Sequence, residues 1–145
     1  MKANFFLTDF KQLAPHSKSL CWLTSAAVSA GEPAEIPSQF ERVDLNELII
    51  NGDDCFITRA NGDSMEADIF HGDFLIVNRN LQAQNGDKVV ASVNGLATVK
   101  IFSESPKGLH LVASNGKYAP RKMSPKDDFE ICGVVTHVVH CVRRK

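Results

Sequence analysis

A serine in a glycine turn is the first residue whose type and setting could do chemistry. Ser64 follows a short apolar run and lies within residues 61–65, Asn-Gly-Asp-Ser-Met. Such a turn lets the backbone N–H groups of Asp63 and Ser64 converge near the serine oxygen, as an oxyanion site requires. Because similar turns are common in proteins without catalysis, Ser64 by itself is a weak indication of a nucleophile.

A lysine inside an otherwise apolar strand is the second candidate. Lys100 lies in residues 96–102, where strand alternation places it on the same face as Leu96, Thr98 and Phe102. Apolar surroundings disfavour an ammonium group, which lowers its pKa and leaves a neutral amine that can act as a base. The alternative is an edge strand whose lysine points to water.

The sequence leaves open which base would activate the serine. A desolvated Lys100 could take the Ser64 proton directly, which is the simpler arrangement. A Ser-His-Asp triad is the alternative, but no histidine is tied to Ser64 by the sequence. His137 and His140 are separated by an odd number of residues within one expected strand, so they face opposite sides and do not suggest a joint site.

A small-residue bond near the N-terminus is a candidate substrate. Ala30 and Gly31 lie in a segment of small residues ahead of Pro33 and Pro37. Small side chains in an extended segment can enter a tight cleft in which bulky ones would clash. The same composition also fits a flexible linker.

The elements that must position these residues are mostly short strands. Residues 1–40 lack a sustained period and predict an extended N-terminal arm, and Asp44 with Glu47 forms a capping-box pattern that predicts one short helix before Asn51. Runs rich in β-branched and aromatic residues, separated by Asn-Gly and Gly-Asp turns, predict a compact, largely antiparallel β domain over residues 41–145. The expected strands are 55–60, 74–78, 88–93, 96–102, 109–114 and 131–139.

Composition narrows the classes of function. A chain of 145 residues with a formal net charge of −1 suits one domain with an appendage, and it lacks the strongly basic character of a DNA-binding protein. We find no apolar run of about 20 residues, so a cytoplasmic protein without a membrane span is expected. The four cysteines form no CxxC pair and no zinc-finger spacing, so neither a metal, a cofactor nor a disulfide framework is indicated.

The order of these motifs resembles the LexA/UmuD family of self-cleaving proteins. The resemblance covers the whole expected β domain, and the segments 43–49 and 133–139 resemble the UmuD branch in particular. Ala30 stands where that branch has cysteine, Glu32 replaces an apolar residue, and the loop of residues 66–69 is one residue shorter. The matching blocks are residues 61–65, 69–77, 86–90 and 97–100.

The resemblance implies a function for each candidate residue. Ser64 is the expected nucleophile, Lys100 the general base, and Ala30-Gly31 the bond that the chain cuts in itself when it meets a RecA filament on single-stranded DNA. Backbone N–H groups of Asp63 and Ser64 are the expected oxyanion donors. By the same resemblance the trimmed chain forms a homodimer, the accessory subunit of an error-prone, UmuC-like translesion DNA polymerase of the Y family in SOS mutagenesis.

Two other functions compete with this interpretation. A non-catalytic module could keep the fold and only bind a polymerase, and a LexA-like repressor fragment would need a DNA-binding domain that an arm of about 40 residues is too short to hold. We therefore expect no direct sequence-specific DNA binding. Whether the bond is cut within one chain or between dimer mates is left open by the sequence.

Overall fold

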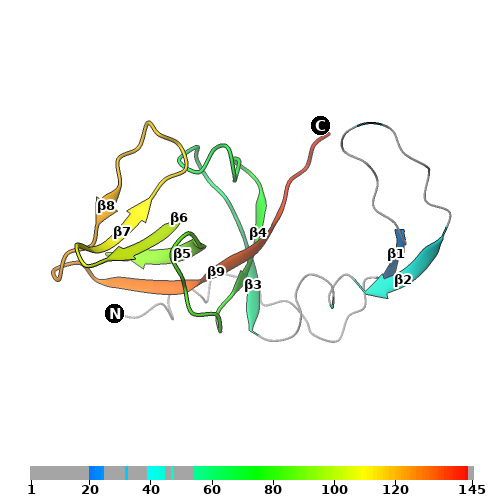
Figure 1. The fold of residues 1–145 in the computed structure, drawn as a ribbon, viewed down its shortest axis with the longest axis horizontal. Coiled ribbons are helices and arrows are strands. Elements are labelled where there is room, and N and C mark those ends of the chain that lie inside the picture. The colour runs from blue at the N-terminus through cyan, green and yellow to red at the C-terminus, as the bar shows by residue number, and fades with distance from the viewer. Residues whose placement is uncertain (1–19, 25–31, 33–38, 45–46, 48–53, 144–145) are drawn as a thin grey trace. The chain divides into compact units, whose positions relative to one another are not determined.

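Strands are the regular elements of the computed structural model, which describes residues 20–24, 32, 39–44, 47 and 54–143 (Figure 1). These residues fall into two units, one holding the first two strands and the other holding the rest. Within the described residues, no helix is long and apolar enough to cross a membrane. The strands are β1 (Leu20–Thr24), β2 (Phe40–Asp44), β3 (Cys55–Arg59), β4 (Phe74–Asn78), β5 (Lys88–Val93), β6 (Leu96–Ser105), β7 (Gly108–Val112), β8 (Arg121–Lys122) and β9 (Phe129–Val139).

The larger unit is built on one sheet in which every described pairing is antiparallel. The strand order is β3-β4-β9-β5-β6-β7-β8. Tight turns between neighbouring strands follow from the local sequence. Asn94 and Gly95, which join β5 to β6, have φ values of 52° and 82°, as a two-residue hairpin turn requires. The expected mostly antiparallel β architecture is confirmed.

The long strand β9 connects the two halves of this sheet. Its C-terminal part pairs with β4, from Val134 to Val139, and its N-terminal part pairs with β5, from Phe129 to Val134. The register shifts once in each ladder, between Ile76 and Val77 and between Val90 and Ala91. Such irregularities bend a strand and increase its twist, and Figure 1 shows β9 curving from β5 to β4.

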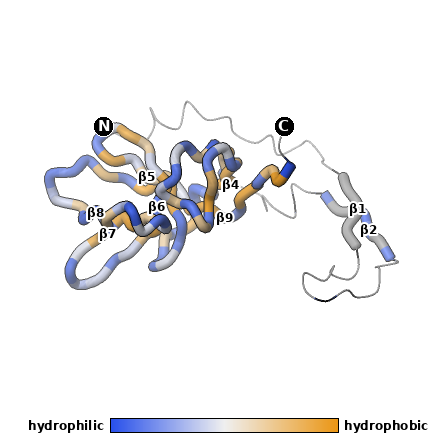
Figure 2. The backbone as a smooth tube through the Cα atoms, turned by 90° about the horizontal axis from the view of Figure 1, so that it is seen from above, coloured by the Kyte–Doolittle hydropathy of each residue, from blue (hydrophilic) through white to orange (hydrophobic). Residues whose placement is uncertain are grey.

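Apolar side chains form two core clusters, one on each side of β5. Val90 belongs to the first cluster, whereas Val89, Ala91 and Val93 belong to the second. Strand alternation explains this division, because successive side chains point to opposite faces. Hydrophobic stretches lie along the strands and hydrophilic residues occupy most of the connecting loops (Figure 2). The curled sheet therefore buries both faces of β5.

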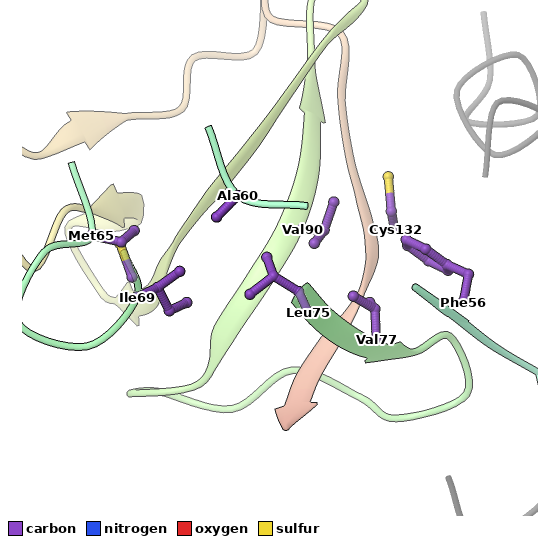
Figure 3. Close-up of a cluster of buried hydrophobic side chains, with 8 residues drawn as sticks. All are labelled: Phe56, Ala60, Met65, Ile69, Leu75, Val77, Val90 and Cys132. Carbon is purple, nitrogen blue, oxygen red and sulfur yellow. The ribbon is translucent and has the colours of Figure 1, made fainter. Parts of the chain in front are cut away.

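The first cluster matters for the site, because it includes two residues from the connection between β3 and β4. Met65 and Ile69 are 4% and 1% exposed, and Figure 3 shows them at one end of the cluster. Burying a side chain of this size contributes about 1.5–3 kcal/mol, so both residues anchor their segment to the sheet. The cluster consists of Phe56, Ala60, Met65, Ile69, Leu75, Val77, Val90 and Cys132.

The structure differs from the sequence predictions in a few elements. The expected arm contains β1, which pairs with β2 at the expected start of the β domain; the two strands run antiparallel from Leu20 opposite Asp44 to Thr24 opposite Phe40. Both strands have five residues, too few to produce a clear sequence period. The short edge strand β8 was likewise not predicted. The helix expected over residues 44–50 falls mostly outside the described residues, and it stays a prediction, as does the boundary between residues 40 and 41.

We predict that Gly133→Ala destabilises the fold by at least about 2 kcal/mol, because overpacking of a tight site forces the backbone to move. An added Cβ at Gly133 would lie 2.6 Å from Val77 Cγ1 and 2.8 Å from the backbone oxygen of Asn78. Urea unfolding measures the change. Gly116→Ala is the matched control, because nothing lies within 4 Å of its added Cβ. Equal stability of the two variants would contradict this account of the β4–β9 contact.

Candidate active site

Ser64 lies in the loop between β3 and β4, which we call the nucleophile loop (residues 61–71). Two backbone hydrogen bonds extend the β3–β4 ladder to its base, from Ala60 N–H to the Asp73 oxygen and from Gly72 N–H to the Ala60 oxygen, both 2.8 Å. Gly62 has a φ of 93°, which a residue without Cβ adopts readily. The chain therefore turns sharply just before Ser64, as the sequence predicted.

Short-range hydrogen bonds and core contacts fix the shape of this loop. The N–H of Ile69 donates to the Met65 oxygen at 2.8 Å, and both side chains are buried in the first cluster. The buried carboxylate of Asp73 accepts the N–H of Phe70 at 2.8 Å. Ala67 has a φ of 89°, which is strained for a residue with a Cβ. The short segment after Ser64 contains no glycine, so Ala67 adopts the strained backbone conformation of its turn. The buried side chains of Met65 and Ile69 hold the segment in place.

Lys100 lies on β6, an interior strand of the sheet, and its amine is next to the serine. Lys100 Nζ is 2.8 Å from Ser64 Oγ, although the two residues are 36 positions apart. The sheet order places β6 between β5 and β7, so the alternative of an edge-strand lysine that points to water is wrong. Register in the β5–β6 ladder sets this position, with Lys100 opposite Val89.

Two further oxygens surround the amine. Nζ lies 3.0 Å from Thr98 Oγ1 and 3.0 Å from the backbone oxygen of Val99. A neutral amine has two N–H bonds and one lone pair. When these two oxygens accept its N–H groups, the lone pair is left for the hydroxyl of Ser64. Thr98 shares a face with Lys100, as strand alternation predicted, but no sequence pattern indicated that its hydroxyl would contact the amine.

Burial lowers the pKa of Lys100 below its ordinary value of 10.5. The cause is desolvation, which disfavours the charged ammonium form. A lowered pKa increases the share of lysine that is a neutral amine at a given pH. The electrostatic setting of Lys100 therefore favours a base over a cation.

Ser64 and Lys100 line a cleft of about 240 Å³. Its walls come from the end of β3, the nucleophile loop, β5 and the start of β6. Several wall residues are small, among them Ala60, Gly62 and Ala97. Walls of this kind leave room for an extended backbone that carries small side chains. The full lining is Thr58, Arg59, Ala60, Asn61, Gly62, Ser64, Met65, Ile69, Val90, Ala97, Thr98, Val99 and Lys100.

Three of the described histidines, His71, His137 and His140, bond to groups other than the serine. His71 Nδ1 accepts the N–H of Gly62 at 3.0 Å, His140 Nδ1 pairs with the Asp73 carboxylate, and His137 Nδ1 lies 3.0 Å from Thr136 Oγ1. Among the described residues, the titratable group bonded to Ser64 Oγ is Lys100. The geometry therefore favours the Ser-Lys arrangement over a triad.

Other candidate residues are placed only in part. Ser64 lines the cleft and Asp63 precedes it in the nucleophile loop, and among the described residues no hydrogen bond is made by either backbone N–H. Ala30 and Gly31 lie outside the described residues, so their role as the cleaved bond stays a prediction. In the part of the chain that the structure describes, no group of three or more His, Cys, Asp or Glu residues could hold a metal ion.

Sequence reasoning missed the residues of the β7–β8 connection that contact the nucleophile loop, among them Asn115 and Tyr118. Asn115 bonds to the backbone of Asp63 and Ser64, and the Tyr118 hydroxyl donates to the Asp63 carboxylate. The Asn-Gly pair at 115 was assigned only to a turn. No local pattern predicts these contacts, because they join positions more than 50 residues apart.

Comparisons with known proteins identify relatives of this chain. Curated relatives that match the chain are named LexA repressor. The one from Syntrophobacter fumaroxidans is 37% identical over 119 residues, covering 81% of this chain and 57% of the relative. The one from Streptomyces coelicolor is 36% identical over 117 residues, covering 79% of this chain and 49% of the relative. The chain therefore spans about half the length of these curated relatives.

A family match covers most of the chain. Residues 23–136 match the family described as Peptidase S24-like. The matched span includes the nucleophile loop, the cleft and both Ser64 and Lys100. This chain therefore belongs to the S24-like peptidases, the LexA/UmuD family of self-cleaving serine peptidase domains.

Proposed function

We propose that Ser64 and Lys100 form the catalytic dyad with which this chain cuts its own Ala30-Gly31 bond. The observation that carries the proposal is the 2.8 Å separation between Ser64 Oγ and a half-buried Lys100 amine. A serine becomes a strong nucleophile only when an adjacent base takes its proton. Membership of the S24-like peptidases supports the same chemistry.

The proposed reaction has two stages. Ser64 Oγ attacks the carbonyl carbon of Ala30 while its proton moves to the neutral Lys100 amine. The bond to the Gly31 nitrogen then breaks, and the Lys100 ammonium returns the proton to that nitrogen as it leaves. Water, deprotonated by the again neutral Lys100, hydrolyses the ester at Ser64 and regenerates the serine.

Two features of the cleft fit this reaction. The N–H groups of Asp63 and Ser64 are the proposed donors to the oxyanion that forms on Ala30, and among the described residues neither N–H is engaged in a hydrogen bond. Because the substrate is part of the same chain or of a dimer mate, its local concentration is high. Such a site must stay inactive until it is needed. We propose that a RecA filament shifts the population of chains toward the form in which the arm is docked in the cleft.

The proposed cellular role is that of the UmuD branch. Segments 43–49 and 133–139 resemble that branch, and they support a trimmed homodimer that serves a translesion DNA polymerase subunit. A second candidate, the peptidase portion of a repressor, is favoured by the curated relatives, which are named LexA repressor. Co-purification with a UmuC-like polymerase subunit supports the first role. Specific retention of promoter DNA by the uncut protein as the cell makes it supports the second and contradicts the first.

The first prediction concerns the two proposed catalytic residues. We expect Ser64→Ala and Lys100→Ala to lose at least about 10³-fold in the rate of self-cleavage, because neither nucleophile nor base can be replaced by a neighbour. The protein is incubated at alkaline pH or with RecA filament, and mass spectrometry follows the appearance of a fragment that begins at Gly31. Continued cutting by either variant would contradict the proposed dyad, and an uncut wild type would contradict self-cleavage.

The second prediction concerns pH. Only the neutral amine accepts the Ser64 proton, so the rate rises about tenfold per pH unit while Lys100 is mostly charged. Because burial lowers the Lys100 pKa, the rise levels off below the ordinary lysine value of 10.5. Initial rates of filament-free cleavage across this range measure the midpoint. A midpoint at or above 10.5 would exclude a desolvated Lys100 as the base.

The third prediction concerns Thr98, a positioning residue. Thr98→Val keeps the shape of the side chain and removes the oxygen that lies 3.0 Å from Lys100 Nζ. We expect about a tenfold slower cleavage, the effect of losing one hydrogen bond worth about 1.4 kcal/mol. Thr136→Val is a matched control, because Thr136 lies on β9 and donates to the backbone oxygen of Ile76. If Thr98→Val cleaves as fast as this control, Thr98 does not orient the amine, and the backbone oxygen of Val99 is sufficient.

A further inference from the structure

The connection between β7 and β8 holds the nucleophile loop at the residues that flank the serine oxygen. The Asn115 side chain donates from Nδ2 to the backbone oxygen of Asp63 at 3.1 Å. The Asn115 backbone N–H donates to the backbone oxygen of Ser64 at 3.0 Å. A single residue thus binds two consecutive carbonyl groups, one on each side of the proposed nucleophile.

Holding these carbonyls also sets the direction of the N–H groups in the same peptide planes. In a trans peptide the C=O and N–H bonds point in opposite directions, and no cis bond occurs among the described residues. The Asp63 carbonyl shares its plane with the Ser64 N–H. When Asn115 holds that carbonyl, the Ser64 N–H must point away from Asn115. Among the described residues this N–H donates no hydrogen bond, so it is available to a ligand.

The Asn115 side chain is itself held in the orientation that this contact needs. Its Oδ1 accepts the N–H of Lys117 at 3.1 Å, and its backbone oxygen accepts the N–H of Tyr118 at 3.1 Å. Since Oδ1 is engaged within its own turn, Nδ2 is the atom that faces Asp63. The turn thus presents a donor to the loop in a fixed direction.

Neighbouring contacts from the β7–β8 connection hold other parts of the nucleophile loop, but they do not bind the peptide between Asp63 and Ser64. The Tyr118 hydroxyl donates to the Asp63 side chain, and Ser114 Oγ donates to the Asp68 carboxylate at 2.7 Å. The N–H of Glu66 also donates to the Asp63 oxygen, at 3.1 Å, but Glu66 belongs to the same loop and moves with it. Asn115 ties the carbonyl to the sheet.

We infer that Asn115 is a positioning residue for the oxyanion site, acting through the peptide between Asp63 and Ser64. The inference rests on the proposed function. Asn115 keeps the Ser64 N–H aimed into the cleft, so that the donor is in place before the negative charge develops. A donor that is already oriented stabilises the transition state without reorganisation at the moment of reaction.

The test is self-cleavage by the full chain carrying Asn115→Ser. A serine at this position can still accept the Lys117 N–H, but it is too short to reach the Asp63 oxygen. We expect the cleavage rate on the alkaline plateau to fall at least about tenfold, toward the 10²-fold loss that follows from removing an oxyanion donor. The pH midpoint of the rate stays unchanged, because Lys100 remains desolvated and bonded to Thr98.

The controls separate this effect from a loss of structure. Asn80→Ser is the same substitution at an exposed residue between β4 and β5, and it should cleave at the wild-type rate. A midpoint that rises toward 10.5 together with a slower rate would mean that Lys100 has become solvated, which overturns a specific role for Asn115. A variant within about threefold of wild type also overturns it, because that is under 0.7 kcal/mol.

Folding is followed by thermal unfolding of each variant. If Asn115→Ser does not fold, Asn115→Asp gives the same readout, because its carboxylate still accepts the Lys117 N–H and cannot donate to Asp63. Cleavage of Asn115→Asp at the wild-type rate overturns the inference. Wild-type protein that stays uncut contradicts the proposed function and this inference together, whereas a cleaving wild type with an equally active Asn115 variant contradicts the inference alone.

Discussion

The contact between the Ser64 hydroxyl and the Lys100 amine is the interaction on which the rest of the site depends. A lysine next to a serine is useful as a base only when its amine is neutral, and neutrality requires that the amine be taken out of water. The sheet meets this requirement by placing Lys100 on an interior strand with its amine against the nucleophile loop. Desolvation lowers its pKa, while Thr98 and Val99 satisfy its N–H groups.

Precision in this contact comes from packing on one side and from hydrogen bonds on the other. Met65 and Ile69 bury the far part of the nucleophile loop in the core, which holds the loop against the sheet. Asn115 binds the carbonyls of Asp63 and Ser64 from the β7–β8 connection. Apolar burial supplies most of the free energy but is not directional, so the directions of the peptide planes must come from hydrogen bonds. Both kinds of support are needed at a site whose atoms must be aligned.

The long strand β9 determines whether these supports come together. It joins β4, which follows the nucleophile loop, to β5, which pairs with the strand of Lys100. Gly133 on β9 lies against β4, and any side chain there would meet Val77 and the Asn78 backbone. A shift of register at this point would move the serine and the lysine apart. The active-site geometry therefore depends on the register of β9, because this strand pairs with both β4 and β5.

The local structure and the chemical candidates could be predicted from the amino-acid sequence. Turn residues such as Asn94 and Gly95 and the alternation of apolar residues depend on neighbours in the chain, so they predicted most strands, the hairpin and the shared face of Thr98 and Lys100. The motifs around Ser64 and Lys100 predicted the family. The distance between Ser64 and Lys100, the extent to which Lys100 is desolvated and the contacts of Asn115 could not be predicted in this way. They depend on burial and on strand register between residues far apart in sequence, which are set when the chain folds.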